Sequence, residues 1–331
     1  MSSLSQLKII NTLYLVIIFL LFLYNNHLNL LLNTLKSKNN FNNGNINQIK
    51  ESLNMCYKSR SLYYKKQWNI DESNLITIQD KLKYLTIHES PDFKSKIVDK
   101  ILLHDYSIKK LGKDICVPII KIYNNSEEIK LEDLPEKFVL KCNHGSGMNI
   151  LCNNKSNFNL EKAKYDLNKW KLINYGLKSR EFQYINVDIK IFSEVYLKDN
   201  IEDYKLYCFH GEPKFIRVQK HLEGMNGKIN NYYDLNWKLT DIESGLKGFF
   251  RRPDIIIEKP KNLDLMIKYS KKLSEDFVFV RVDFYSINDN IYLGEMTFSP
   301  SNILFKLKNR EQSIKLGKLI DINKIRHDFF N

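Results

Sequence analysis

Two acidic residues and an arginine near the C-terminal end of the chain have the spacing of a site for a metal ion and phosphate. Arg281 and Asp283 are two residues apart, as are Glu295 and Thr297, and a turn sequence at 288–290 separates the two pairs. If a hairpin turn is centred on the middle residue of 288–290, Asp283 lies opposite Glu295 and Arg281 lies opposite Thr297. Because strand side chains alternate between two faces, all four are expected on one face of the hairpin.

This arrangement would bring two like charges together. Carboxylates directly across a strand pair repel one another, and a divalent cation bound between them would remove that cost. Oxygen ligands suit Mg²⁺, with Mn²⁺ as an alternative ion, and Arg281 beside the ion would hold a phosphate. A second interpretation stays open, in which the hairpin face is solvated and Arg281 screens both Asp283 and Glu295.

A glycine-bearing loop offers a second site for phosphate. Lys141 ends a predicted strand over 137–141, and the tetrapeptide 144–147 (His-Gly-Ser-Gly) leads to another strand over 148–152. Glycines let backbone N–H groups approach a phosphate closely, and the lysine supplies a positive charge. The spacing matches neither a P-loop nor a dinucleotide-binding fingerprint, so an ordinary hairpin loop is the competing interpretation.

The end of a third predicted strand, over 189–197, is a candidate adenine site. Its last residues are Glu194-Val195-Tyr196-Leu197. A strand edge with free backbone groups beside apolar side chains can hold an adenine ring, while an acidic residue further along the chain can meet the ribose.

The pattern of elements predicts an α+β protein with much antiparallel sheet. Helical spacing of apolar residues begins at Leu160 and again after Asn262, which is a suitable N-cap. Alternating residues predict four more strands, over 203–209, 213–219, 278–286 and 291–298.

Composition restricts the classes of function. The 331 residues are 43% hydrophobic, enough for a substantial core, and the net charge of +13 favours an anionic partner. The basic residues are dispersed, without an aromatic RNA-binding strand motif, which argues against a nucleic-acid partner. Five cysteines without a CxxC pair exclude a disulfide scaffold and a zinc module.

The first 74 residues differ in character from the rest. Residues 9–32 are largely apolar and, as a helix, would extend roughly 36 Å, enough to cross a bilayer. A single uncleaved membrane anchor is the prediction, and a buried or interfacial helix is the alternative. An Asn-rich tether and a basic aromatic segment follow over 33–74. Lysines flank both ends of 9–32, so orientation in the membrane is not encoded.

Taken in order, several motifs resemble the TupA-like ATP-grasp family, which is linked to teichuronopeptide and other surface-polysaccharide synthesis. The resemblance covers about 75–305, leaving 306–331 as a C-terminal tail. It rests on IQDKL (78–82), Asp99-Lys100, LPEKFVLKCNHGSG (134–147), the helix containing Trp170, REFQY (180–184), SEVYL (193–197), DYKLYCFHGEPKFI (203–216) and FVRVDFYSINDNIYLGEMTFSP (279–300).

The resemblance implies an ATP-grasp fold, in which nucleotide lies between two α+β subdomains, and a role for each motif. The residues that it places near ATP are Lys100, Lys141, His144, Gly145, Ser146, Gly147, Glu194, Val195, Leu197, Asp203 and Lys205. The magnesium ligands that it implies are Asp283, Glu295 and Thr297. Arg281 and Lys141 are its implied catalytic residues, Lys141 contacting phosphate and Arg281 contacting either the transferred phosphate or the acceptor carboxylate.

The activity that these parts imply is ligation of a carboxylate to an amine. A substrate carboxylate attacks the γ-phosphate of ATP, and an amine then displaces phosphate from the acylphosphate. The nucleophiles belong to the substrates, so the protein needs cations and positioning and no catalytic triad. The expected partners are ATP, an acidic glycan or peptide, an amine donor and the membrane, with the catalytic domain in the cytosol and a lumenal site as the alternative.

One departure from the family leaves other functions open. The family usually follows its proline with a small residue and glycine, but Pro300 is followed by Ser301-Asn302-Ile303. That turn helps to hold the acceptor in related ligases. This departure keeps open a non-catalytic scaffold that binds nucleotide or polyanion. Phosphorylation of a hydroxyl is a further alternative, because ATP-grasp folds also serve kinases.

Overall fold

The computed structural model describes residues 68–89, 91–199, 201–221, 227–301 and 306–325. The chain divides into a unit over 1–74 and a compact unit over 75–331, and the fold below is that of the second unit. The predicted anchor over 9–32 and most of the predicted tether lie outside the described residues. In the described part of the chain, no helix is both long and apolar enough to cross a membrane.

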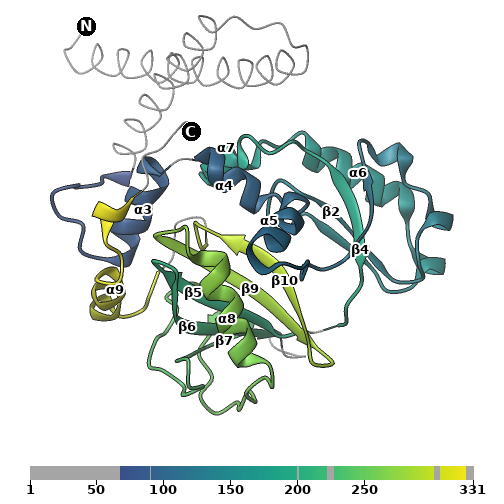
Figure 1. Cartoon of the computed structure of the whole chain (residues 1–331). Coiled ribbons are helices and arrows are strands. Elements are labelled where there is room, and N and C mark those ends of the chain that lie inside the picture. The colour runs from purple at the N-terminus through teal and green to yellow at the C-terminus, as the bar shows by residue number, and fades with distance from the viewer. Residues whose placement is uncertain (1–67, 90, 200, 222–226, 302–305, 326–331) are drawn as a thin grey trace, which may run out of the picture. The chain divides into compact units, whose positions relative to one another are not determined.

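A four-stranded antiparallel sheet forms the smaller of two layered parts (Figure 1). Its strand order is β1-β4-β2-β3. The strands are β1 (Ile119–Tyr123), β2 (Phe138–Cys142), β3 (Asn149–Cys152) and β4 (Ile191–Val195). Alternate residues such as Phe138, Leu140 and Ile191 are fully buried against helix α6 (Leu160–Lys171). The other face of this sheet is therefore available to carry polar groups.

A six-stranded sheet forms the larger part, in the order β10-β9-β5-β6-β7-β8. Its strands are β5 (Asp203–Phe209), β6 (Glu212–His221), β7 (Lys228–Tyr233), β8 (Phe249–Phe250), β9 (Phe279–Ile287) and β10 (Asn290–Thr297). All neighbours are antiparallel except β7 and β8. One face is apolar, with Leu206, Val282 and Phe284 packed together with Leu263 and Met266 of helix α8 (Leu263–Ser274).

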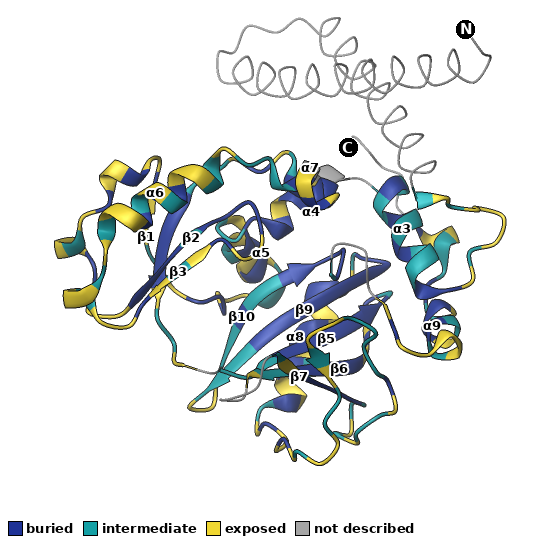
Figure 2. Cartoon of the chain, turned by 180° about the vertical axis from the view of Figure 1, so that it is seen from behind, coloured by how far each residue is buried: buried dark blue, intermediate teal, exposed yellow. Residues whose placement is uncertain are grey.

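Two helices from opposite ends of the described chain pack together beside the larger sheet (Figure 2). They are α3 (Ile78–His88) and α9 (Arg310–Gly317). Leu82 of α3 and Leu316 of α9 are buried in one cluster with Tyr207, Phe215 and other aromatic residues of the sheet. Part of the segment set apart in sequence as a C-terminal tail thus belongs to the core, because its apolar residues cover the end of the sheet.

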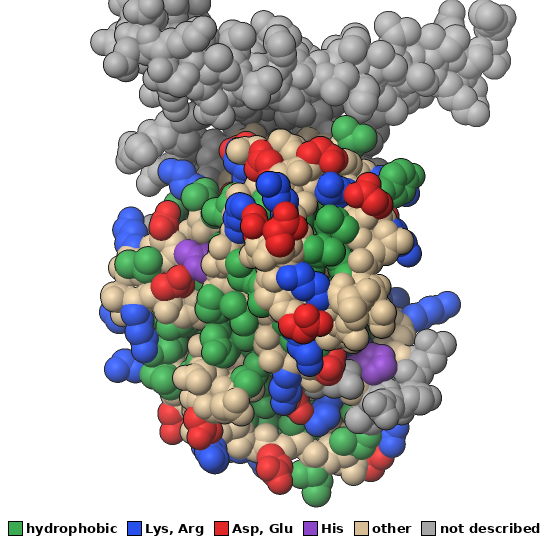
Figure 3. Space-filling view, turned by 90° about the vertical axis from the view of Figure 1, so that its right-hand side faces the viewer, with side chains coloured by type: hydrophobic (Ala, Val, Ile, Leu, Met, Phe, Trp, Pro, Cys, Tyr) green, Lys and Arg blue, Asp and Glu red, His purple; other side chains and the backbone are tan. Residues whose placement is uncertain are grey.

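The remaining helices are α4 (Pro91–Val98), α5 (Leu102–Leu111) and α7 (Tyr175–Ser179). They place the turn at 99–101 and the segment 180–184 close to the site described below. On the face drawn in Figure 3, basic and acidic side chains of the described residues are interspersed. On that face the basic excess does not form a continuous patch.

Candidate active site

The β9–β10 hairpin has the predicted pairing of the acids, but its turn and its register near the turn differ from the prediction. Asn288 and Asp289 both have positive φ, so the turn has two residues, of the kind that suits a hairpin, and is not centred on Asp289. Near the turn the register is therefore one residue away from the predicted one. A β-bulge between Leu293 and Glu295 restores it, so that Glu295 pairs with Asp283.

The bulge decides which face Glu295 occupies. If Gly294 were paired in the ladder like its neighbours, with no bulge, the turn would place Glu295 opposite Val282 on the apolar face, because strand side chains alternate. The bulge lies where the backbone N–H of Leu293 donates to the Ile115 carbonyl at 2.7 Å. The hydrogen bond from Leu293 to Ile115, which precedes β1, thus lies at the bulge that brings Glu295 opposite Asp283.

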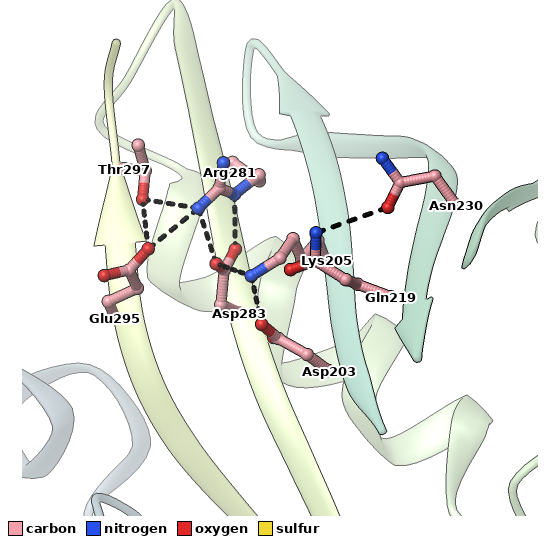
Figure 4. A network of polar contacts seen from close by, with 8 residues as sticks. All are labelled: Asp203, Lys205, Gln219, Asn230, Arg281, Asp283, Glu295 and Thr297. Atoms are coloured by element: carbon pink, nitrogen blue, oxygen red, sulfur yellow. Dashed lines mark hydrogen bonds and ion pairs between the residues drawn. The ribbon is translucent and has the colours of Figure 1, made fainter. Parts of the chain in front are cut away.

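Arg281 connects the two acids in the structure (Figure 4). Its Nε donates to Asp283 Oδ1 at 2.6 Å, and its Nη2 donates to Asp283 Oδ2 at 2.6 Å. The same Nη2 donates to Glu295 Oε1 at 2.8 Å and to the Thr297 hydroxyl at 3.0 Å. The predicted pairing of Asp283 with Glu295 and of Arg281 with Thr297 is confirmed. In this arrangement Arg281 screens both acids.

Strand β5 adds a second cation to the cluster. Lys205 pairs across the sheet with Asp283 and donates from Nζ to Asp283 Oδ2 at 2.7 Å. It also forms an ion pair with Asp203, two residues earlier on the same face. Asp283 is thus held by two cations, while Glu295 Oε2 has no hydrogen-bond partner among the described residues.

The two acids differ in how readily they ionise. Burial raises the pKa of Asp283, and the charge of Glu295 adds to this effect, against the opposing pull of Arg281 and Lys205. Burial would also raise the pKa of Glu295, but Arg281, Lys205 and Lys100 together hold it well below its usual range. Glu295 is therefore the carboxylate that stays ionised most readily, and it carries the free oxygen.

The smaller sheet contributes a separate charged pair. Lys141 of β2 forms an ion pair with Glu194 at the end of β4. Val195 follows with 39% of its surface exposed, and its backbone N–H donates to the Pro118 carbonyl at 3.0 Å. A small cavity borders this strand end, lined by Lys100, Leu103, His104, Cys116, Val117, Glu194, Leu293 and Gly294. The strand end predicted to hold adenine thus borders a cavity that also touches β10.

Lys100 links the two sheets electrostatically. Its Nζ donates to the carbonyl of Gly145 at 2.5 Å, and it interacts with Glu295 of the larger sheet and with Glu194 of the smaller one. Burial lowers its pKa, as does neighbouring Lys141, while Glu295 and Glu194 oppose this. Lys100 therefore joins the glycine loop to the acid cluster.

Asp99 and Asn143 hold Lys100 and the loop in place. Asp99 is buried and accepts the backbone N–H of Ile101 at 2.9 Å, at the start of α5. Asn143 donates to Asp99 at 3.0 Å and to the Asp188 carbonyl at 2.8 Å, and accepts from the N–H of Lys190 at 2.8 Å. The Asp-Lys motif thus supplies a positioning residue beside a charged one.

Removal of the Asn143 side chain should destabilise the fold. Asn143→Ala breaks one buried and two partly buried hydrogen bonds and leaves their partners unsatisfied, so we expect the free energy of unfolding in urea to fall by about 3 kcal/mol. The control is Asn154→Ala, which removes two exposed hydrogen bonds, donated by the backbone N–H and the hydroxyl of Ser156, and should cost about 1 kcal/mol or less. Equal losses in the two variants would contradict a role for Asn143 in holding this junction.

The glycine loop is only partly exposed. Ser146 and Gly147 face solvent, and Gly147 has a φ of 74°, a conformation that glycine adopts without strain. Gly145 is buried, and a Cβ there would lie 2.7 Å from the ring of Tyr175. The side chain of His144 is also buried, with Nε2 3.2 Å from the Trp170 carbonyl. The imidazole thus packs against the end of α6, while the exposed tip of the loop carries the groups open to a ligand.

Glu181 is a further site residue to which the sequence assigned no role. It is 4% exposed and hydrogen-bonds the side chains of Ser179 and Tyr175. Burial, followed by the charge of Glu295, raises its pKa to about 7, while Arg281 pulls in the opposite direction. Its position in the segment 180–184 was the only available signal, because a single acid in a polar segment has no distinctive spacing.

A comparison with known protein families identifies the fold. The sequence profile described as TupA-like ATPgrasp matches residues 76–321. The chain belongs to the TupA-like ATP-grasp family. The suspected family and the mixed α+β ATP-grasp fold are thereby confirmed, and no curated protein matches the sequence.

Solved structures with a related arrangement include ligases and synthetases. D-alanine–D-alanine ligase from Bacillus anthracis has 19% identity and a TM-score of 0.39, over 75% of this chain and 73% of that chain. The ATP complex of that ligase matches with 19% identity and a TM-score of 0.36, over 62% of this chain and 56% of that one. N5-carboxyaminoimidazole synthetase from Staphylococcus aureus has 16% identity and a TM-score of 0.36, over 62% of this chain and 45% of that chain. This TupA-like chain thus spans about half the length of the last two.

Proposed function

We propose that this chain is an ATP-dependent ligase that joins a carboxylate to an amine through an acylphosphate, and that it modifies an acidic glycan or peptide of the cell surface. The observation that carries the proposal is the convergence of charges on one site. Asp283 and Glu295 lie side by side with Arg281 and Lys205, and Lys100 interacts with Glu295 while holding the glycine loop. Membership of the ATP-grasp family supports ATP as the substrate that these cations meet.

The acid pair has the chemistry of a magnesium site. Asp283 and Glu295 offer carboxylate oxygens on adjacent strands, Thr297 offers a hydroxyl, and Glu295 Oε2 has no partner among the described residues. Hard oxygen ligands of this kind suit Mg²⁺. These three residues would hold the ion, and a bound ion would neutralise charge on the transferred phosphate.

The remaining residues would position ATP and stabilise the charge that develops in transfer. In the proposed reaction, a carboxylate oxygen of the acceptor attacks the γ-phosphorus and the bond to ADP breaks. The amine then attacks the acyl carbon and phosphate leaves. Arg281 and Lys205 would face the transferred phosphate once they no longer bind the acids, and Lys141 and Lys100 would face the other phosphates. Val195 and Leu197 would border adenine, and Asp203 would meet the ribose.

The test is formation of a trapped acyl product. Purified full-length protein is incubated with Mg-ATP, hydroxylamine and each of a panel of carboxylates, which includes D-glucuronate and tri-L-glutamate. Carboxylate-dependent ADP release together with a hydroxamate is the expected result, because hydroxylamine intercepts an acylphosphate. ADP release with a phosphorylated hydroxyl and no hydroxamate would instead identify a kinase. No thermal stabilisation by millimolar Mg-ATP would favour a scaffold and overturn the ligase proposal.

Membrane attachment belongs to the same proposal. The apolar segment 9–32 would anchor the protein, with the ATP-binding domain on the cytosolic side where ATP is abundant. In sealed membrane vesicles of known orientation, the full chain should stay with the membrane after alkaline washing. Protease added to the cytosolic face should digest the domain, and protection of the domain there would place it in the lumen.

A further inference from the structure

A buried arginine extends the polar face of the larger sheet beyond the residues used so far. Arg217 of β6 pairs with Lys205 on one side and with Tyr232 of β7 on the other. Cross-strand partners share a face, so Arg217 lies on the same side of the sheet as Lys205 and Asp283. It is 5% exposed. The face that carries the acid cluster therefore continues over two more strands.

Arg217 has no carboxylate partner among the described residues. The nearby acids already have cations, since Arg281 and Lys205 bind Asp283, and Lys205 also binds Asp203. Arg217 donates to the Tyr232 hydroxyl and lies over the Tyr207 ring at 6.0 Å, but its Nε has no acceptor in the described part of the chain. Asp283 interacts with Arg217 electrostatically, but a buried guanidinium that forms no ion pair of its own is costly. A purely structural role would leave this donor unsatisfied.

A second free donor lies beside it. Asn230 of β7 is 1% exposed and pairs across the strands with Gln219, which is two residues from Arg217 on the same face. Gln219 donates to Asn230 Oδ1 at 3.4 Å, so the Asn230 amide nitrogen is left pointing elsewhere, and it has no acceptor among the described residues (Figure 4). Two unsatisfied N–H donors on adjacent strands, one of them charged, are complementary to an anion.

We propose that Arg217 and Asn230 bind a second anionic group of the acceptor, a carboxylate separate from the one that reacts. This inference rests on the proposed ligase function and narrows its substrate to an acceptor with several carboxylates. Arg281 and Lys205 would face the reacting end, and Arg217 would hold the next acidic unit across the strands. A polycarboxylate such as an acidic oligosaccharide or peptide would supply a carboxylate to both ends of this face, whereas a simple monocarboxylate leaves Arg217 unpaired.

The experiment measures binding of carboxylate probes by calorimetry, without nucleotide, in the full-length protein. The probes are tri-L-glutamate, tri-D-galacturonate and acetate. Wild-type protein should bind at least one trimer tenfold or more tightly than acetate. Arg217→Gln and Asn230→Leu should each weaken binding of that trimer, by about tenfold or more for the loss of the charged donor. The matched control is Arg252→Gln, which removes a half-exposed arginine paired with Asp254 and should bind like wild type.

The outcomes separate this inference from the proposed function. Circular dichroism and Mg-ATP binding are measured on every variant, and Asn230→Leu provides the test if Arg217→Gln does not fold. Equal trimer affinity in Arg217→Gln and Arg252→Gln overturns the inference, as does equal wild-type affinity for trimers and acetate. Trimer binding that depends on Arg217 in a protein that does not bind Mg-ATP would support the anion site and overturn the ligase function.

Discussion

Replacing both acids of the β9–β10 hairpin should abolish the dependence of ATP binding on Mg²⁺. In Asp283→Asn/Glu295→Gln, the amides keep the shape of the carboxylates but cannot neutralise a cation. Loss of the several kcal/mol that a bound ion contributes corresponds to a fall in ATP turnover of roughly a thousandfold or more. ATP affinity is measured by titration at increasing Mg²⁺, and turnover by ADP release with whichever carboxylate of the panel supports hydroxamate formation. Wild-type affinity should rise with Mg²⁺, and the affinity of the double variant should not.

The control for this prediction carries the same change of charge elsewhere on the same part of the fold. Asp254→Asn/Glu243→Gln removes two acids from ion pairs with Arg252 and Lys308 near the surface, and should retain wild-type behaviour. The double variant of the acid pair also leaves Arg281 without a carboxylate partner and Lys205 with Asp203 alone, so its melting temperature should fall. For this reason the response to Mg²⁺ in folded protein is the decisive quantity. A normal response in the double variant would exclude Asp283 and Glu295 as metal ligands.

The hairpin shows how far local pattern predicts the site. Alternation of side chains and an assumed turn centred on Asp289 gave the observed pairing of Asp283 with Glu295, although the turn itself is centred elsewhere. The two-residue turn and the bulge at Gly294 are opposite one-residue departures that cancel at the acids. Neither could be predicted from spacing alone, because the bulge coincides with a contact between Leu293 and the distant Ile115.

Residues whose role depends on tertiary packing were predicted less well. The sequence treats all residues of the glycine loop alike, but the His144 ring is buried near the Trp170 carbonyl while Ser146 is exposed. Arg217 lies in a correctly predicted strand, yet nothing in the strand pattern shows that its described neighbours leave it without an ion pair of its own. The membrane helix over 9–32 stays a prediction, because it lies outside the described residues.

Glu181 should make the protein less stable as the pH rises. Its pKa is about 7 in the folded protein against an ordinary value of 4.5, so the folded state holds a proton that the unfolded chain has already released. The stabilising contribution of the protonated carboxyl is complete below about pH 4.5, declines as the pH rises through 7, and is then absent. The free energy of unfolding of Glu181→Gln minus that of wild type should therefore increase by about 3 kcal/mol between pH 4.5 and pH 8.

The measurement is urea unfolding of wild type and Glu181→Gln across this pH range, without nucleotide or Mg²⁺. The quantity compared is the difference in the free energy of unfolding between the two proteins at each pH. Tyr175→Phe provides a second arm, because the Tyr175 side chain hydrogen-bonds the carboxylate and lowers its pKa. Without that bond the carboxylate is less well stabilised, so the decline in stability should move to higher pH. A difference between wild type and Glu181→Gln that is constant with pH would show that Glu181 is ionised throughout. In that case the negative charge of Glu181 must be balanced by Arg281, which already forms an ion pair with Glu295. The acid cluster would then contain Glu181 as an additional carboxylate.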